Sequence, residues 1–214
     1  MTTQTNKDFV DYLDFFIEID KLKRMPRKIW VSLGIKNPET VMDHLYKLTL
    51  MAWVFGKDQK GIKMEKILKM ALCHEIASAQ TGDLITPYGR TLPNNQKEKK
   101  KIIEKWPRLS KQEKKDKYLK DYEKEKKALK GMTKNLSKSV REDMMSLFDE
   151  YKTLSTQESR LLNQLNVLAV LLEGLLRKKD GANISVDFLW ESAYEKCDSD
   201  ICFDIMNELK RRFS

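Results

Sequence analysis

Two histidines, His44 and His74, and the carboxylate of Glu75 are the side chains of this sequence best able to hold a metal ion. Apolar residues recur at three- and four-residue intervals around both histidines, so each imidazole is expected on the buried side of a helix. Imidazoles and a carboxylate that converge in one cleft would form a divalent-metal site. Hydrogen-bonded core histidines would give the same pattern, and the spacing leaves both interpretations open.

The segments that must position these residues have helical periodicity throughout. Eight glycines and five prolines in 214 residues are few for a sandwich or barrel, and no segment alternates convincingly between apolar and polar residues. The predicted fold class is therefore all-α. Outside the charged segment, helices are expected at about 8–22, 38–55, 64–79, 139–152, 157–178, 187–196 and 201–212.

The positive charge is concentrated in one part of the chain. The formal net charge is +9, and residues 97–138 hold 17 basic and 7 acidic residues, a net of +10, so the remainder is close to neutral. The sequence predicts one domain over residues 1–214, with a basic helical insertion at 97–138. This segment is either a solvated charged helix or an electrostatic footprint for RNA, an acidic protein or a large complex.

The three cysteines bear on the compartment. Cys73, Cys197 and Cys202 are an odd number at spacings that fit no disulfide framework, which indicates reduced thiols. The start of the sequence has no secretory pattern, and no run reaches the roughly 18 apolar residues that a membrane span requires. A cytoplasmic location without a membrane span is expected, with an organelle left open.

Several short motifs follow one another along the chain. They read LKRMPRKIW at 22–30, NPETVMDH at 37–44, ALCHEIA at 71–77, GDLITPY at 82–88, LFDEY and STQESR within 147–160, and WES at 190–192. In this order they resemble the HD-domain metal-dependent phosphohydrolases, in the branch with bacterial 5'-deoxynucleotidase and eukaryotic HD domain-containing protein 2. The resemblance covers about 8–92 and 140–195. It implies an HD-domain helical bundle, often a homodimer, around the basic insertion.

The resemblance assigns the metal to His44, His74, Glu75 and Asn166. The family has aspartates at the last two positions, so Glu75 is longer by one methylene and Asn166 offers only a neutral oxygen. The family's general-acid glutamate falls on Ser78, whose hydroxyl cannot exchange a proton usefully near neutral pH. The catalytic positions, Glu75 and Ser78, are therefore degenerate relative to the family.

The substrate side of the motif set is retained. The resemblance places Arg27 against a phosphate and Trp30 beside the sugar or base, and it places Asp83 and Thr86 in a loop next to the nucleotide. Each residue also has a plain structural interpretation, as a surface arginine, a core tryptophan or part of a turn.

These departures favour a non-catalytic HD-fold protein, a pseudoenzyme that serves as a binding or assembly subunit. Residues 97–138 would contact an acidic partner, and the retained pocket would take a nucleotide. The alternative is a weak or re-tuned 5'-nucleotidase that hydrolyses deoxynucleoside monophosphates with a divalent metal such as Mn, Co, Zn or Mg.

Overall fold

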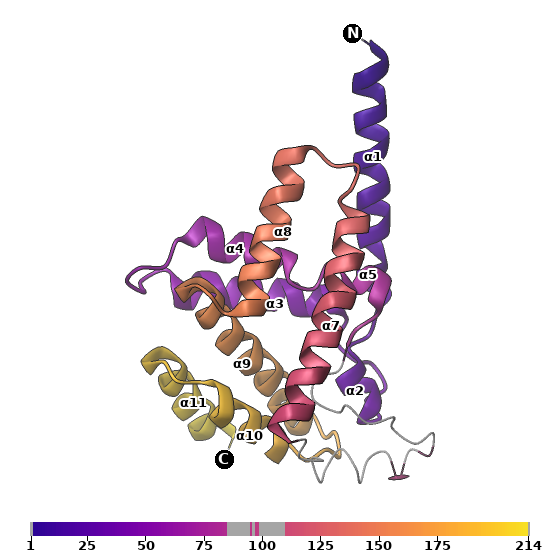
Figure 1. Ribbon diagram of the computed structural model, residues 1–214. Helices are drawn as coiled ribbons and strands as arrows, with labels where there is room; N and C mark the ends of the chain where they lie inside the picture. The colour runs from indigo at the N-terminus through magenta and orange to yellow at the C-terminus, as the bar shows by residue number, and fades with distance from the viewer. Residues whose placement is uncertain (1, 85–94, 96, 99–109, 214) are drawn as a thin grey trace.

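The computed structural model describes residues 2–84, 95, 97–98 and 110–213 (Figure 1). This part of the chain is helical, with no strand and one isolated antiparallel bridge between Pro26 and Thr40. The all-α prediction is confirmed. The elements are α1 (Thr2–Asp20), the 3-10 helix η1 (Lys21–Arg24), α2 (Lys28–Ser32), α3 (Val41–Gly56), α4 (Met64–Cys73), α5 (Ser78–Thr81), α7 (Lys111–Met132), α8 (Lys138–Thr153), α9 (Gln157–Lys179), α10 (Asp187–Lys196) and α11 (Asp200–Phe213). No helix in these ranges is long and apolar enough to cross a membrane.

Helix α9 is the centre of the bundle and packs against α3, α4, α8, α10 and α11. It begins at a capping box, in which the Thr156 hydroxyl accepts from the Ser159 amide and the Ser159 hydroxyl accepts from the Thr156 amide. Its leucines are buried at helical spacing, and they form the main core with side chains of α3, α4, α10 and α11. The apolar face of α9 therefore fixes where the surrounding helices sit.

The charged segment contributes a packed helix. In Figure 1, α7 runs beside α8, and the two helices are in contact. The Tyr122 and Phe148 rings stack at a centroid distance of 5.9 Å, and Leu129 is fully buried in a second core cluster. The interpretation of 97–138 as a wholly solvated segment is therefore wrong for α7, whose inner face belongs to the core.

The predicted helix at 64–79 is interrupted. Helix α4 ends at Cys73, and the next residues form i→i+3 bonds, from the Ile76 amide to the Cys73 carbonyl and from the Ser78 amide to the Glu75 carbonyl. The prediction of one continuous helix was wrong because a tightened turn keeps the same apolar side buried. This turn carries His74 and Glu75, and it places Ser78 over Glu75.

A short clasp holds the segment before α3. The Arg27 amide donates to the Glu39 carbonyl at 2.8 Å, and the Val41 amide donates to the Met25 carbonyl at 2.8 Å. These bonds flank the Pro26–Thr40 bridge and close the residues between them into a loop that contains α2. The clasp joins Arg27 to the start of α3, which carries His44.

Candidate functional site

The two histidines meet at the centre of the bundle. His44 on α3 and His74 at the end of α4 are 0% and 1% exposed, and their ring centroids lie 6.2 Å apart. Asn166 of α9 completes the group, because its Oδ1 lies 2.7 Å from His44 Nε2. Its Nδ2 donates to the Tyr151 hydroxyl, and the Tyr151 ring packs against His74. The structure thus brings together three of the four residues predicted to hold a metal.

Both imidazoles are neutral. Burial lowers the pKa of His44 well below its ordinary value, and burial lowers the pKa of His74 to about 4. His74 Nδ1 lies 2.8 Å from the Ala71 carbonyl oxygen, which only accepts, so the proton is on Nδ1 and Nε2 keeps its lone pair. Within the described residues, the buried His74 Nε2 and His44 Nδ1 have no hydrogen-bond partner.

Glu75 lies beside the histidines and turns partly away from them. Its Oε1 is 3.9 Å from His74 Nε2 and 3.6 Å from Arg27 Nη1, and its Oε2 accepts the Ser78 hydroxyl at 2.9 Å. Burial alone would raise the pKa of Glu75, but the charge of Arg27 outweighs it and the pKa lies below its usual value. Glu75 is therefore ionised, and Ser78 is a donor to it.

Arg27 is shared between two carboxylates. Its Nε is 3.4 Å from Asp83 Oδ2, and Asp83 also accepts the Lys28 amide at 2.6 Å. Burial raises the pKa of Asp83, although the positive charge of Arg27 opposes this. Arg27 Nε and Nη1 are buried without a properly aligned hydrogen bond among the described residues, and they remain available to a further oxyanion.

A cavity of about 150 Å³ opens beside this group. Arg27, Glu75, Asp83 and Asn166 line it, together with Ile29, Leu84, Val167, Val170, Leu189, Ser192 and Lys196. The sequence interpretation missed Lys196 as a wall residue. The i, i+3, i+7 spacing of Leu189, Ser192 and Lys196 on one face of α10 was the available signal.

Trp30, one of the predicted substrate residues, is not among the residues that line this cavity. Trp30 is fully buried in the main core, and its Nε1 donates to Glu39 Oε2 at 3.1 Å. Of the two interpretations of Trp30, its position supports the structural one. Thr86 lies outside the described residues, so its predicted role next to the nucleotide stays a prediction.

A network of charged side chains next to His44 adjoins the site, and the sequence interpretation missed it. Lys47 Nζ donates to Glu39 Oε1 at 2.8 Å and to Glu173 Oε2 at 2.5 Å, and Arg177 binds the other oxygen of Glu173. Glu39 Oε1 is also 3.9 Å from His44 Nδ1. The network therefore fixes Glu39 against both Trp30 and His44.

The nitrogen and oxygen atoms at this site are of types that ligate a divalent metal, but too few of them belong to ionisable side chains. In the described part of the chain, no three His, Cys, Asp or Glu side chains form a group that could hold an ion. The unpaired Nε2 of His74 and the Asn166 oxygen are atoms that can ligate ions such as Mn, Co or Zn, and His44 Nε2 could do so once its proton moves to Nδ1. A metal here would depend on the Asn166 amide oxygen.

A family model described as the HD domain matches residues 19–201 of the sequence. The chain belongs to the HD domain family. The family predicted from the motifs is confirmed. The 5'-deoxynucleotidase HDDC2 of Dictyostelium discoideum is 30% identical to it over 169 residues, which cover 76% of this chain and 75% of that protein. The protein of the same name from Mus musculus is 27% identical over 161 residues, which cover 75% and 67%.

Solved structures agree with the assignment. A conserved hypothetical protein from Pyrococcus furiosus superposes with a TM-score of 0.68 at 26% identity, covering 93% of this chain and 99% of that one. A predicted metal-dependent phosphohydrolase from Magnetospirillum magnetotacticum MS-1 superposes with a TM-score of 0.65, covering 99% and 97%. At 19% identity, this second match bears on the fold alone. The bundle seen here is therefore the fold of the HD domain family.

Proposed function

We propose that this chain is a divalent-metal-dependent phosphohydrolase of low turnover that acts on 5'-deoxynucleoside monophosphates. The observation that carries the proposal is the juxtaposition of two buried, neutral histidines with an arginine whose Nε and Nη1 lie in ion pairs with Asp83 and Glu75 but form no aligned hydrogen bond among the described residues. The relatives named as 5'-deoxynucleotidases support this alternative better than the non-catalytic subunit that the sequence departures favour.

His44, His74, Glu75 and Asn166 would hold the ion. When bound, a divalent ion supplies Lewis-acid polarisation and neutralises phosphate charge. His44 must then offer Nε2 as an acceptor, so its ring proton moves to Nδ1, where Glu39 Oε1 lies 3.9 Å away. The charge network under Glu39 would hold that tautomer.

Arg27 would bind the phosphate. Its burial alone would lower the pKa of the guanidinium, but Glu75 and Asp83 outweigh that effect and raise it, so the group stays charged. Arg27 lines the cavity, and its buried Nε and Nη1 lack aligned hydrogen-bond partners in the described residues. Asp83 would position Arg27 and keep the Lys28 amide in place.

Turnover should be low because the proton supply is weak. The Ser78 hydroxyl donates a hydrogen bond to the ionised carboxylate of Glu75. Neither group can give up a proton to a leaving group near neutral pH. A positioned general acid typically contributes about 10²–10⁴-fold to the rate. Its loss supports a second candidate function, in which the chain binds a nucleotide and does not hydrolyse it.

Metal-dependent phosphate release tests the proposal. Chelator-treated protein is reloaded with Mn²⁺, Co²⁺, Zn²⁺ or Mg²⁺ and assayed against a panel of deoxynucleoside monophosphates. Slow release that His74→Ala abolishes is expected, together with a rise of about 10²-fold or more in the Ser78→Glu variant, which restores the acid. Asn207→Asp, an exposed change on α11, is the control.

The outcome that contradicts hydrolysis is equally clear. If wild-type protein releases no phosphate with any metal, while a folded Glu75→Asp/Ser78→Glu/Asn166→Asp variant does, the binding-only candidate holds. If neither protein binds a nucleotide or a metal, both candidates are wrong.

Binding of an acidic partner by the basic segment, residues 97–138, is a separate proposal. We infer that the exposed lysines of α7, Lys120 and Lys127 among them, attract an acidic partner. Deleting 97–138 would remove the buried Leu129 and damage the core, so charge reversal is the better test. Lys120→Glu/Lys127→Glu should weaken association and reduce its salt dependence; association unchanged by both would contradict it. Homodimer formation also stays a prediction.

A further inference from the structure

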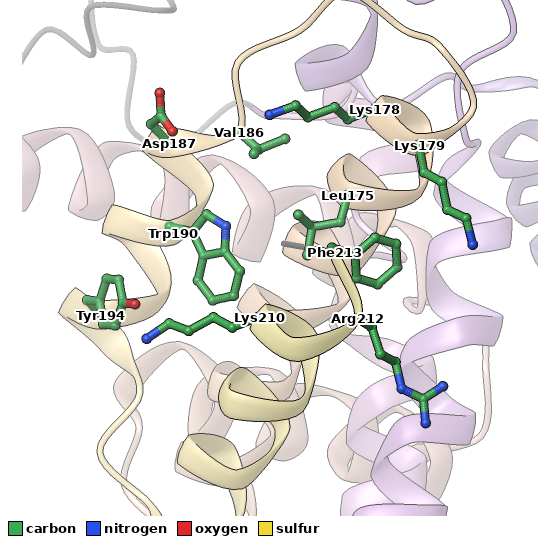
Figure 2. Close-up of a pocket in the computed structure, with 10 residues that line it drawn as sticks. All are labelled: Leu175, Lys178, Lys179, Val186, Asp187, Trp190, Tyr194, Lys210, Arg212 and Phe213. Atoms are coloured by element: carbon green, nitrogen blue, oxygen red, sulfur yellow. The ribbon is translucent and has the colours of Figure 1, made fainter.

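A second, larger cavity of about 700 Å³ lies on the other side of α10 from the histidine site. Leu189 and Ser192 of α10 line the first cavity, whereas Trp190 and Tyr194 of the same helix line the second. Figure 2 shows Lys210 of α11 extending beneath the Trp190 ring toward Tyr194, and Lys178 of α9 extending toward Asp187, whereas Lys179 points away on the Phe213 side. The two cavities therefore use different faces of one helix.

The charged residues that line this cavity are mostly basic. Lys178 and Lys179 come from the last turn of α9, Lys210 and Arg212 come from the last turn of α11, and Asp187 is the one acid in the wall. Basic residues commonly stabilise the C-terminal turn of a single helix. Here two such turns converge on one cavity, so their cations add to a local positive potential.

Two of these four cations, Lys178 and Lys179, have no carboxylate partner within the described residues. Arg212 pairs with Glu208, and Asp187 accepts a hydrogen bond from the Ser185 hydroxyl. Lys178 and Lys179 form no ion pair within the described residues, and the Lys179 ammonium lies 5.9 Å from the Phe213 ring. The cavity is therefore suited to an anion.

An aromatic platform lies next to these cations. The Trp190 and Tyr194 rings, one helical turn apart, have centroids 6.1 Å apart and planes inclined by 29°. Tyr194 is 54% exposed, so its ring is accessible to a ligand. The Lys210 ammonium lies 5.1 Å from the Tyr194 centroid and 5.9 Å from that of Trp190.

We propose that this cavity binds a nucleotide, with the base against Trp190 and Tyr194 and the phosphate among Lys178, Lys179 and Lys210. Base stacking on an aromatic ring is generally stronger than an exposed cation–π contact, so a base can displace the Lys210 ammonium, which then meets the phosphate. The same chemistry is presented by a free nucleoside phosphate and by a nucleotide of a single strand. This site is separate from the proposed hydrolytic function.

Binding without metal tests the proposal in two arms. In the presence of chelator, wild-type protein is titrated with ATP by calorimetry and with a fluorescent single-stranded oligodeoxyadenylate by anisotropy. Tyr194→Ser should weaken binding by about tenfold through lost stacking. Lys178→Glu/Lys179→Glu should weaken it at least as much and flatten its salt dependence. The arm that binds identifies the source of the nucleotide.

Matched controls separate this site from other surfaces. Tyr46→Ser removes a ring on α3 that is 69% exposed, and Lys57→Glu/Lys60→Glu makes the same charge change at exposed lysines in the turn after α3. Both should leave binding unchanged, and Tyr194→Ser should leave any phosphate release unchanged. The proposal is overturned if neither probe binds, if Tyr194→Ser binds as wild type does, or if the Lys57→Glu/Lys60→Glu variant loses as much affinity as the α9 variant.

Discussion

The Nε2 atom of His44 lies 2.7 Å from the Oδ1 atom of Asn166, and this contact joins α3 to α9 across 122 residues of sequence. An amide oxygen only accepts, so His44 must donate from Nε2. This nitrogen of His44, a residue that the resemblance assigns to the metal, is thus occupied by a neutral neighbour. A metal ion has to compete with this hydrogen bond, and it gains no negative charge from Asn166 in return.

Replacing Asn166 by aspartate should therefore raise metal affinity. A carboxylate at this position adds one negative charge next to the ion, and two unit charges 4 Å apart attract by roughly 4 kcal/mol at an effective dielectric constant near 20. After the cost of burying the charge, we expect the Kd for Mn²⁺ to fall by at least about tenfold, measured by calorimetry. Asn207→Asp should have no such effect, and an equal change in both variants would contradict the proposed ligand role.

Glu39 should contribute to stability more than an ordinary surface acid does. It is 4% exposed, accepts the Trp30 indole N–H and binds the Lys47 ammonium. Glu39→Gln removes the charge and leaves these buried donors poorly paired, which should lower the free energy of unfolding by about 1–3 kcal/mol in a denaturant titration. Glu65→Gln, which removes an exposed partner of Lys69, should change it by less than about 1 kcal/mol.

Gly174 marks the closest approach of α9 to α10. A Cβ atom built at this position would lie 2.3 Å from Leu189 Cδ1, and Leu189 is 4% exposed, so it has little room to move. Overpacking in Gly174→Ala should destabilise the protein by about 1–3 kcal/mol. The higher helix propensity of alanine should offset up to about 1 kcal/mol of this loss. Gly56→Ala is the control, since its nearest neighbour would be 3.7 Å away and it should be neutral or stabilising in thermal unfolding.

The thiol of Cys73 should be inert near neutral pH. Cys73 is 7% exposed, and burial raises its pKa to about 11 from an ordinary value of 9.0. Because the thiolate is the reactive form, labelling by a disulfide reagent should be slow at pH 8 and faster toward pH 11. The raised pKa also means that its contribution to the free energy of unfolding is lost as pH rises from about 9 to 11. Exposed Ser139→Cys should label rapidly at pH 8; equal rates would contradict burial.

The sequence predicted the fold where periodicity was strong. Helix α9 was expected at 157–178 and is found at Gln157–Lys179, because its leucine spacing and the Thr156 cap both define it. The break after Cys73 could not be predicted, since i→i+3 and i→i+4 turns bury the same residues over so short a stretch.

The candidate site was only partly predictable. Periodicity placed His44 and His74 inside, whereas the approach of Asn166 came from the resemblance and not from spacing. The charges of Lys47, Glu39 and Glu173 gave no sign of burial, because charged residues are normally expected at the surface. Their pairing depends on helices far apart in sequence, which a local pattern does not report.

The clasp between residues 25 and 41 holds residues that match the family's motifs. Arg27 and Trp30 lie inside the loop that these hydrogen bonds close. His44 lies three residues after Val41, whose amide forms the second of the two bonds. The positions that depart from the family, Glu75, Ser78 and Asn166, all lie on other segments. One continuous stretch of chain thus carries both Arg27 and His44, and the fold brings Glu75 and Asn166 to it from the turn after α4 and from α9.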